Sequence, residues 1–173
     1  MSKHSKGKVD YCLNRLIIEE DKNPDKINPF IIIRKFCDFD SHPAMKILFL
    51  KFCKAALVEK YFWEEGPPGK LLYFSEQLEL LMEACYLIYI EKEFNKRLVK
   101  GDKSSIIPNP FIVIKDFFDL RSLLEWKKSQ HFWLEAGLSN FSVMDNVEPE
   151  EVLIYYSSVE ELLAASYQIT FPC

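Results

Sequence analysis

Apolar positions recur every three or four residues through two long stretches of the chain, which is the period of an amphipathic helix. The repeating positions are Leu71, Phe74, Leu78, Leu81, Cys85 and Ile88 in the first stretch, and Val152, Tyr155, Val159, Leu162, Ser166 and Ile169 in the second. Neither stretch contains an internal Pro or Gly, the residues that interrupt helices. The pattern therefore predicts two long helices, each with one buried face.

The two stretches are parts of a longer repeat at a constant offset of 81 residues. Residues 9–89 align with residues 90–170 without a gap, and the clearest match sets NPFIII at 28–33 on NPFIVI at 109–114. Of the aligned pairs, 21 are identical, whereas unrelated sequences of ordinary composition give about five. We interpret the chain as a tandem duplication of one multi-helix unit.

Side-chain caps mark the start of the second helix of each unit. Asn28 and Asn109 each precede a Pro and an apolar run, which is the arrangement of an N-cap followed by Pro in the first helical turn. An alternative for residues 30–33 and 111–114 is a buried strand, since both runs are rich in β-branched residues. The caps favour the helix.

A third helix is expected to begin after Ser41 in the first unit and after Ser122 in the second, because both serines are placed as N-caps. It should end near Phe62 and near Leu138, and the run Gly66-Pro67-Pro68-Gly69 stops the first of the two. Each unit also opens with a short amphipathic segment, predicted at residues 11–20 and 92–100.

These patterns together predict an all-α fold. The units 9–89 and 90–170 are expected to pack together as one compact domain, preceded by a basic N-terminal tail of residues 1–8. Because no Pro or Gly lies between Leu71 and Lys100, we expect one long shared helix of about 30 residues to join the two copies rigidly.

Composition narrows the class of protein. Apolar residues make up 49% of the chain, as in globular proteins, and charges interrupt every apolar run well before the roughly 20 residues of a membrane span. The lysines of the first eight residues are not followed by the apolar segment of a secretion signal. The five cysteines form no Cys-x-x-Cys pair, which favours reduced thiols in the cytoplasm over disulfides or a zinc site.

No motif for catalysis, for a cofactor or for a metal is recognised. Residues 66–70, GPPGK, lack the spacing and the Ser or Thr of a phosphate-binding loop and are interpreted as a turn. The three histidines are scattered, unlike the ligands of a metal centre. The repeated carboxylates Asp38 and Asp119 are interpreted as caps, and Glu79 and Glu160 as a solvated or Lys-paired face, rather than as acid–base pairs.

Differences between the units point to function, because a residue that the shared fold needs should be kept in both copies. The aromatic run Tyr61, Phe62 and Trp63 is replaced by Ser142-Val143-Met144. We therefore predict that at least one of the three aromatic side chains is exposed and that they bind a partner. The charge is also uneven, with 18 basic and 16 acidic residues before position 108 and 4 basic and 10 acidic residues from there on.

The leading hypothesis is a non-enzymatic helical interaction protein, an adaptor or regulator that binds another protein or associates with itself. One alternative is a nucleic-acid-associated regulator, based on the basic tail and on the Lys- and Arg-rich residues 92–103, although a pI of about 5.5 does not favour it. The other alternative is a small-molecule binder or enzyme with a site between the two repeats, which a deep pocket with convergent polar groups would favour.

Overall fold

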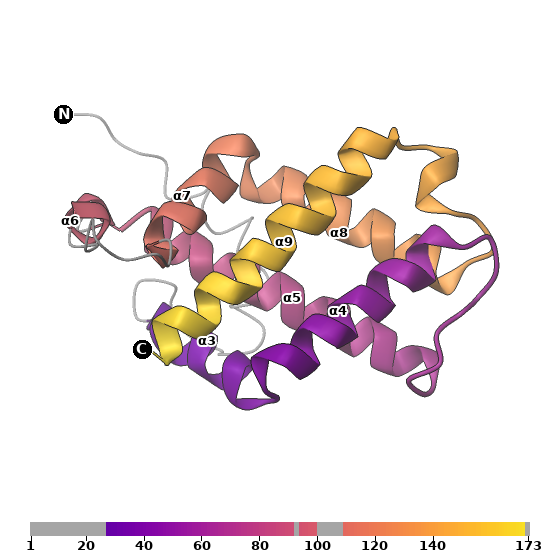
Figure 1. Cartoon of the computed structure of the whole chain (residues 1–173), viewed down its shortest axis with the longest axis horizontal. Coiled ribbons are helices and arrows are strands. Elements are labelled where there is room, and N and C mark those ends of the chain that lie inside the picture. The colour runs from indigo at the N-terminus through magenta and orange to yellow at the C-terminus, as the bar shows by residue number, and fades with distance from the viewer. Residues whose placement is uncertain (1–26, 92–93, 100–108, 172–173) are drawn as a thin grey trace.

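The structure is a computed structural model that describes residues 27–91, 94–99 and 109–171. Within these ranges all regular structure is helical and no strand is present. Figure 1 shows the elements, which are α3 (Pro29–Asp38), α4 (His42–Leu57), α5 (Pro68–Tyr89), α6 (Phe94–Val99), α7 (Pro110–Leu120), α8 (Leu123–Leu138), the 3-10 turn η2 (Val143–Asp145) and α9 (Pro149–Thr170). The predicted all-α fold is confirmed, and the strand alternative for residues 30–33 and 111–114 is wrong. The opening segment predicted at residues 11–20 and the tail at residues 1–8 lie outside the described residues.

The predicted caps are present at the starts of four helices. The Oδ1 atoms of Asn28 and Asn109 accept the backbone N–H groups two residues ahead, at 3.0 Å in both cases. The hydroxyl oxygens of Ser41 and Ser122 accept the N–H groups three residues ahead, at 3.4 and 3.3 Å. These side chains satisfy backbone donors that have no partner inside their helix, and they fix where α3, α4, α7 and α8 begin.

Helix bounds recur at the 81-residue offset. The 16 residues of α8 begin and end 81 positions after those of α4, and the 22 residues of α9 begin and end 81 positions after those of α5. The helix α7 likewise begins 81 positions after α3. We call two residues equivalent when they lie 81 positions apart, and we call residues up to 89 the first half and later residues the second half.

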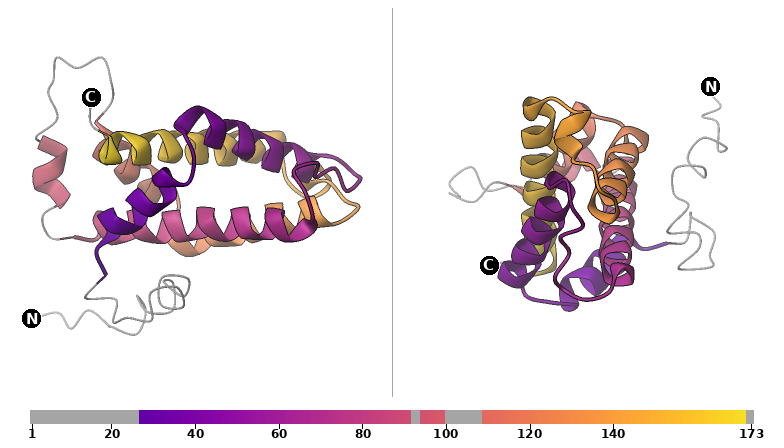
Figure 2. Two further views of the ribbon diagram at one scale, coloured as in Figure 1. Left: turned by 90° about the horizontal axis from the view of Figure 1, so that it is seen from below. Right: turned by 90° about the vertical axis from the view of Figure 1, so that its right-hand side faces the viewer.

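The four long helices lie in two layers, with α4 beside α9 and α5 beside α8 (Figure 2). Each half therefore contributes one long helix to each layer. Across the layers α4 packs closely against α8 of the other half, and much less against α5 of its own half. The buried apolar side chains of both halves join one core cluster, so each half depends on the other to cover its apolar surface.

The helix predicted to join the two halves is not continuous in the structure. α5 ends at Tyr89, where the N–H of Ile90 bonds back to the carbonyls of Tyr86 and Ile88, and α6 is a separate helix of six residues. α6 makes tertiary contacts that periodicity does not show. The guanidinium group of Arg97 in α6 lies 4.8 Å from the ring centre of Phe30, at the start of α3, and 5.6 Å from that of Phe111, at the start of α7.

The third helix of the first half is also shorter than predicted. α4 ends at Leu57 rather than near Phe62, because Val58 is in an extended conformation. The Leu57 carbonyl accepts a hydrogen bond of 2.8 Å from the hydroxyl of Ser142 in the second half, and this contact satisfies an acceptor at the helix end. Residues 58–67 therefore form a long connection to α5, which begins at Pro68.

Candidate functional site: a groove between α4 and α5

A groove of about 560 Å³ lies between α4 and α5 of the first half. Residues of the connection 58–67 and of the α3–α4 junction also contribute to its lining. We call this cavity the α4–α5 groove. It is lined by Phe36, Phe39, Asp40, Ala44, Met45, Ile47, Leu48, Lys51, Trp63, Glu65, Lys70, Tyr73, Phe74 and Gln77.

Trp63 lines the groove from the connection and is itself buried, with 6% of its surface exposed. Its indole N–H is buried and has no acceptor among the described residues. A buried donor without a partner costs about 1–3 kcal/mol. The unpaired N–H is therefore a local cost at the groove wall, which the packing of the indole ring must offset.

The rim of the groove is apolar and exposed. Phe39, Ile47 and Tyr73 all line it, and 63%, 55% and 48% of their respective surfaces are accessible. The rings of Phe39 and Tyr73 lie 6.3 Å apart and form one end of the opening. Large apolar side chains that remain exposed around a cavity are typical of surfaces that bind other molecules.

Charged groups stand at the other end of the opening. Lys51 of α4 forms an ion pair with Glu65 of the connection. Lys70, in the first turn of α5, packs over Gly66, where a Cβ atom would lie only 2.8 Å from the Lys70 side chain. Gly66 also has a φ of +129°, a conformation that favours glycine. Gly66 therefore permits both the turn and the position of Lys70 beside the groove.

The second half has a larger side chain at one of the equivalent positions. Trp126 is equivalent to Met45 and is fully buried, with its ring stacked on Phe117 at 4.2 Å. Its indole N–H donates to the Phe117 carbonyl at 2.9 Å. Trp has a larger side chain than Met, and the Trp126 ring packs against Tyr155 of α9 as well, with the ring centres 6.5 Å apart.

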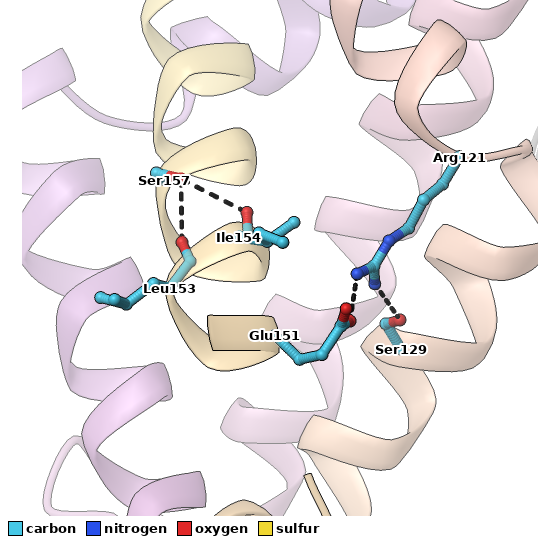
Figure 3. A network of polar contacts seen from close by, with 6 residues as sticks. All are labelled: Arg121, Ser129, Glu151, Leu153, Ile154 and Ser157. Atoms are coloured by element: carbon cyan, nitrogen blue, oxygen red, sulfur yellow. Dashed lines mark hydrogen bonds and ion pairs between the residues drawn. The ribbon is translucent and has the colours of Figure 1, made fainter. Parts of the chain in front are cut away.

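An ion pair closes the second half further (Figure 3). Arg121, at the end of α7, pairs with Glu151 of α9 and contacts the Ser129 hydroxyl of α8 at 3.5 Å. The Arg121 guanidinium also lies 5.1 Å from the Trp126 ring centre. The first half has Asp40 and Lys70 where the second has Arg121 and Glu151, with the signs of charge exchanged.

The predicted partner-binding residues occupy different environments. Tyr61 and Phe62 are exposed, at 41% and 37% of their surfaces, as expected for at least one of the three, and the Lys54 ammonium lies 4.6 Å from the Phe62 ring centre. Trp63 is buried instead and belongs to the groove wall. Sequence reasoning missed the rest of the groove. Comparing the halves position by position at Met45 and Trp126 would have found it.

Other reactive groups in the described part of the chain are held in unreactive states. Burial raises the pKa of the Cys37 thiol to about 11 and that of the Cys85 thiol to about 12, and it also raises the pKa of Cys53. These thiols stay protonated at neutral pH and are poor nucleophiles. The described residues contain no group of three or more His, Cys, Asp or Glu arranged to hold a metal ion.

The basic residues invoked for nucleic-acid binding are only partly described. Lys92, Lys100 and Lys103 lie outside the described residues. Arg97 is engaged within the protein, through Phe30 and Phe111 and through an ion pair of 3.2 Å with Glu91.

The repeated carboxylates are not caps. Asp119 accepts a hydrogen bond of 2.8 Å from the Tyr89 hydroxyl and pairs with Lys115, and Asp38 lies 3.8 Å from Arg34. Both Glu residues are Lys-paired, as one of the two predicted alternatives stated.

No protein-family model, curated protein or solved structure matches this chain. Among the described residues, no helix combines the length and the apolar character that crossing a membrane requires.

Proposed function

We propose that this chain is a non-enzymatic interaction protein, an adaptor or regulator, whose α4–α5 groove binds a segment of a partner protein. The observation that carries the proposal is the contrast between the halves. Equivalent positions line an open groove with an apolar rim in the first half, and in the second half they carry the buried ring of Trp126 and the ion pair between Arg121 and Glu151.

A protein partner fits this surface better than a small molecule does. The exposed apolar side chains Ile47 and Tyr73 belong to the rim, and the exposed Leu50, Tyr61 and Phe62 lie on α4 and on the connection outside the lining. A small molecule inside the cavity would leave the apolar side chains outside the lining in water. A protein segment that lies along α4 can cover both these side chains and the rim.

We further propose that the two halves arose by duplication of one unit and that the second half now acts as the scaffold. The equal helix bounds at the 81-residue offset and the reciprocal packing of α4 and α8 support this history. A duplicated unit frees one copy to change, and here the change enlarges a cavity at positions 40, 45 and 70. We place the protein in the cytoplasm, where the buried free thiols of Cys37, Cys53 and Cys85 would remain reduced.

Site-specific photocrosslinking tests the proposal in native cells. A photoreactive amino acid is placed at Phe39, at the rim of the groove, and in a second variant at the equivalent Leu120, which is comparably exposed beside the closed half. The proposal expects a discrete adduct from position 39 and none of the same mass from position 120. Equal adducts from both positions, or none from position 39, would contradict it.

A further inference from the structure

The exposed side of α4 carries a stripe that combines apolar and basic side chains. Ile47 lies three residues before Leu50 and four before Lys51, Lys54 lies four residues after Leu50, and all four side chains are exposed. Such spacing places them along one face. α4 lies beside α9 in its layer (Figure 2). The groove lies between α4 and the next helix in the chain, α5. This face therefore forms one wall of the opening and the surface next to it.

The second half differs at every equivalent position of this stripe. On α8 the residues are Lys128, His131, Phe132 and Glu135, so Ile47 and Leu50 become polar, Lys51 becomes aromatic and Lys54 becomes an acid. Lys70 across the groove corresponds to Glu151. The combination of two exposed aliphatic residues with Lys51, Lys54 and Lys70 is therefore specific to the half with the open groove, and the shared fold does not require it.

We infer that the occupant of the α4–α5 groove is an amphipathic helix of a partner protein with acidic residues along the edges of its apolar face. This inference rests on the proposed function and adds the chemistry of the partner. Apolar side chains of the helix would enter the groove between Ile47 and Tyr73, and carboxylates at its edges would pair with Lys54 and Lys70.

The carboxylates already present at the groove leave these two ammonium groups for the partner. Glu65 pairs with Lys51. Asp40, at the far end, accepts the backbone N–H of Ser41 at 2.7 Å. Lys54 lies over the ring of Phe62, and Lys70 lies over Gly66. Glu59 and Glu64 are exposed on the connection but do not line the groove.

Selection from a helix library tests the inference. A display library of 20-residue helices, with apolar residues at the spacing of one face and Glu, Gln or Lys allowed at each flanking position, is selected against the full chain. We expect enrichment of Glu at the flanking positions. A selected helix should bind at least tenfold more tightly than its Glu→Gln counterpart, and this difference should disappear in the Lys54→Gln, Lys70→Gln double variant. The Lys128→Gln variant, at an exposed Lys on α8, is the matched control and should keep the difference.

The remaining outcomes separate this inference from the proposed function. One such outcome is that the selected helices show no preference for Glu and yet fail to bind the Ile47→Asp variant. That result would overturn the claim that the partner is acidic and would leave the groove as the binding site. Failure to enrich any helix, or enrichment of helices that ignore Ile47→Asp, would overturn both. If the chain associates with itself at high concentration and Ile47→Asp abolishes this association, the occupant is the acidic second half of another copy. That result would overturn the claim that the occupant is a different protein.

Discussion

The Sγ atom of Cys85 lies 3.9 Å from the Oγ atom of Ser166, and these two residues are equivalent. This contact requires α5 and α9 to approach each other at equivalent positions along their lengths. The ion pairs between the halves are reciprocal in the same way, since Lys127 pairs with Glu79 at 2.9 Å and the equivalent Lys46 pairs with Glu160 at 2.6 Å. Each pair joins the third helix of one half to the long last helix of the other.

The two ion pairs should contribute unequally to stability because only one is buried. The Lys127 and Glu79 side chains are 8% and 3% exposed, whereas Lys46 is 54% exposed. Lys127→Met leaves Glu79 and Glu83 buried without their shared ammonium group, and loss of one partner of a buried pair costs about 3–5 kcal/mol. Lys46→Met, the matched control, should leave the denaturant midpoint nearly unchanged. Equal shifts in the two variants would show that burial does not set the difference.

Asn109 should matter more than Asn28. Both asparagines cap a helix, and removal of such a cap costs about 1 kcal/mol. Only Asn109 also donates from its Nδ2 atom to the carbonyls of Arg97 and Leu98 at the end of α6, each at 3.3 Å. We expect Asn109→Ala to lower the free energy of unfolding by more than Asn28→Ala, and Asn109→Asp to restore the cap alone. Chemical denaturation of the three variants checks this order.

The aromatic run should divide into one structural and two surface residues. Trp63→Ala removes a buried ring and is expected to cost about 3–5 kcal/mol, which corrects the expectation that this residue could be exposed. Trp63→Phe keeps most of the volume and removes only the unpaired N–H, so it should cost much less. Tyr61→Ala and Phe62→Ala should change the melting temperature by no more than a few degrees. A stable Trp63→Ala variant would show that the groove wall does not need this ring.

The buried thiols should resist modification. A pKa raised from 9.0 to about 11 for Cys37 reduces its thiolate fraction at pH 8 by about 100-fold, because the fraction falls tenfold for each unit of pKa above the pH. Cys85 should react even more slowly. In a Cys12→Ser, Cys173→Ser variant, a thiol reagent at pH 8 should therefore label the chain only after denaturant is added. Rapid labelling of the native protein would mean that the core opens readily.

Much of the fold could be predicted from local patterns. The caps at Asn28 and Ser41 and the apolar period of α5 depend on neighbouring residues, so the sequence displays them directly. The ends of α4 and α5 depend on contacts with distant segments. Ser142 caps α4 from the other half, and Arg97 of α6 lies over the rings of Phe30 and Phe111 at the starts of α3 and α7. Neither contact leaves a periodic signal.

The candidate site was only partly accessible from the sequence for the same reason. The aromatic run 61–63 differs between the halves and was found by that difference. The groove lies between α4 and α5, which pack little against each other because α4 packs on α8, and periodicity cannot specify such a tertiary arrangement. The structure relates the differences between the halves at positions 40, 45 and 70 to one another, since all three residues line one cavity.

The most direct test replaces three groove residues of the first half with the residues at the equivalent positions of the second half. The variant Asp40→Arg, Met45→Trp, Lys70→Glu places an indole and an ion pair where Trp126, Arg121 and Glu151 close the other half. The pair Asp40→Arg, Lys70→Glu is made as well, in case the larger ring prevents folding, and circular dichroism verifies the helix content of both.

The measurement is the dissociation constant of the partner identified by crosslinking from position 39, for the wild type and for the closed variants. The account predicts that closure weakens binding at least 100-fold while the melting temperature stays the same or rises. A natively folded closed variant that binds the partner as tightly as the wild type would contradict the claim that the α4–α5 groove is the binding site.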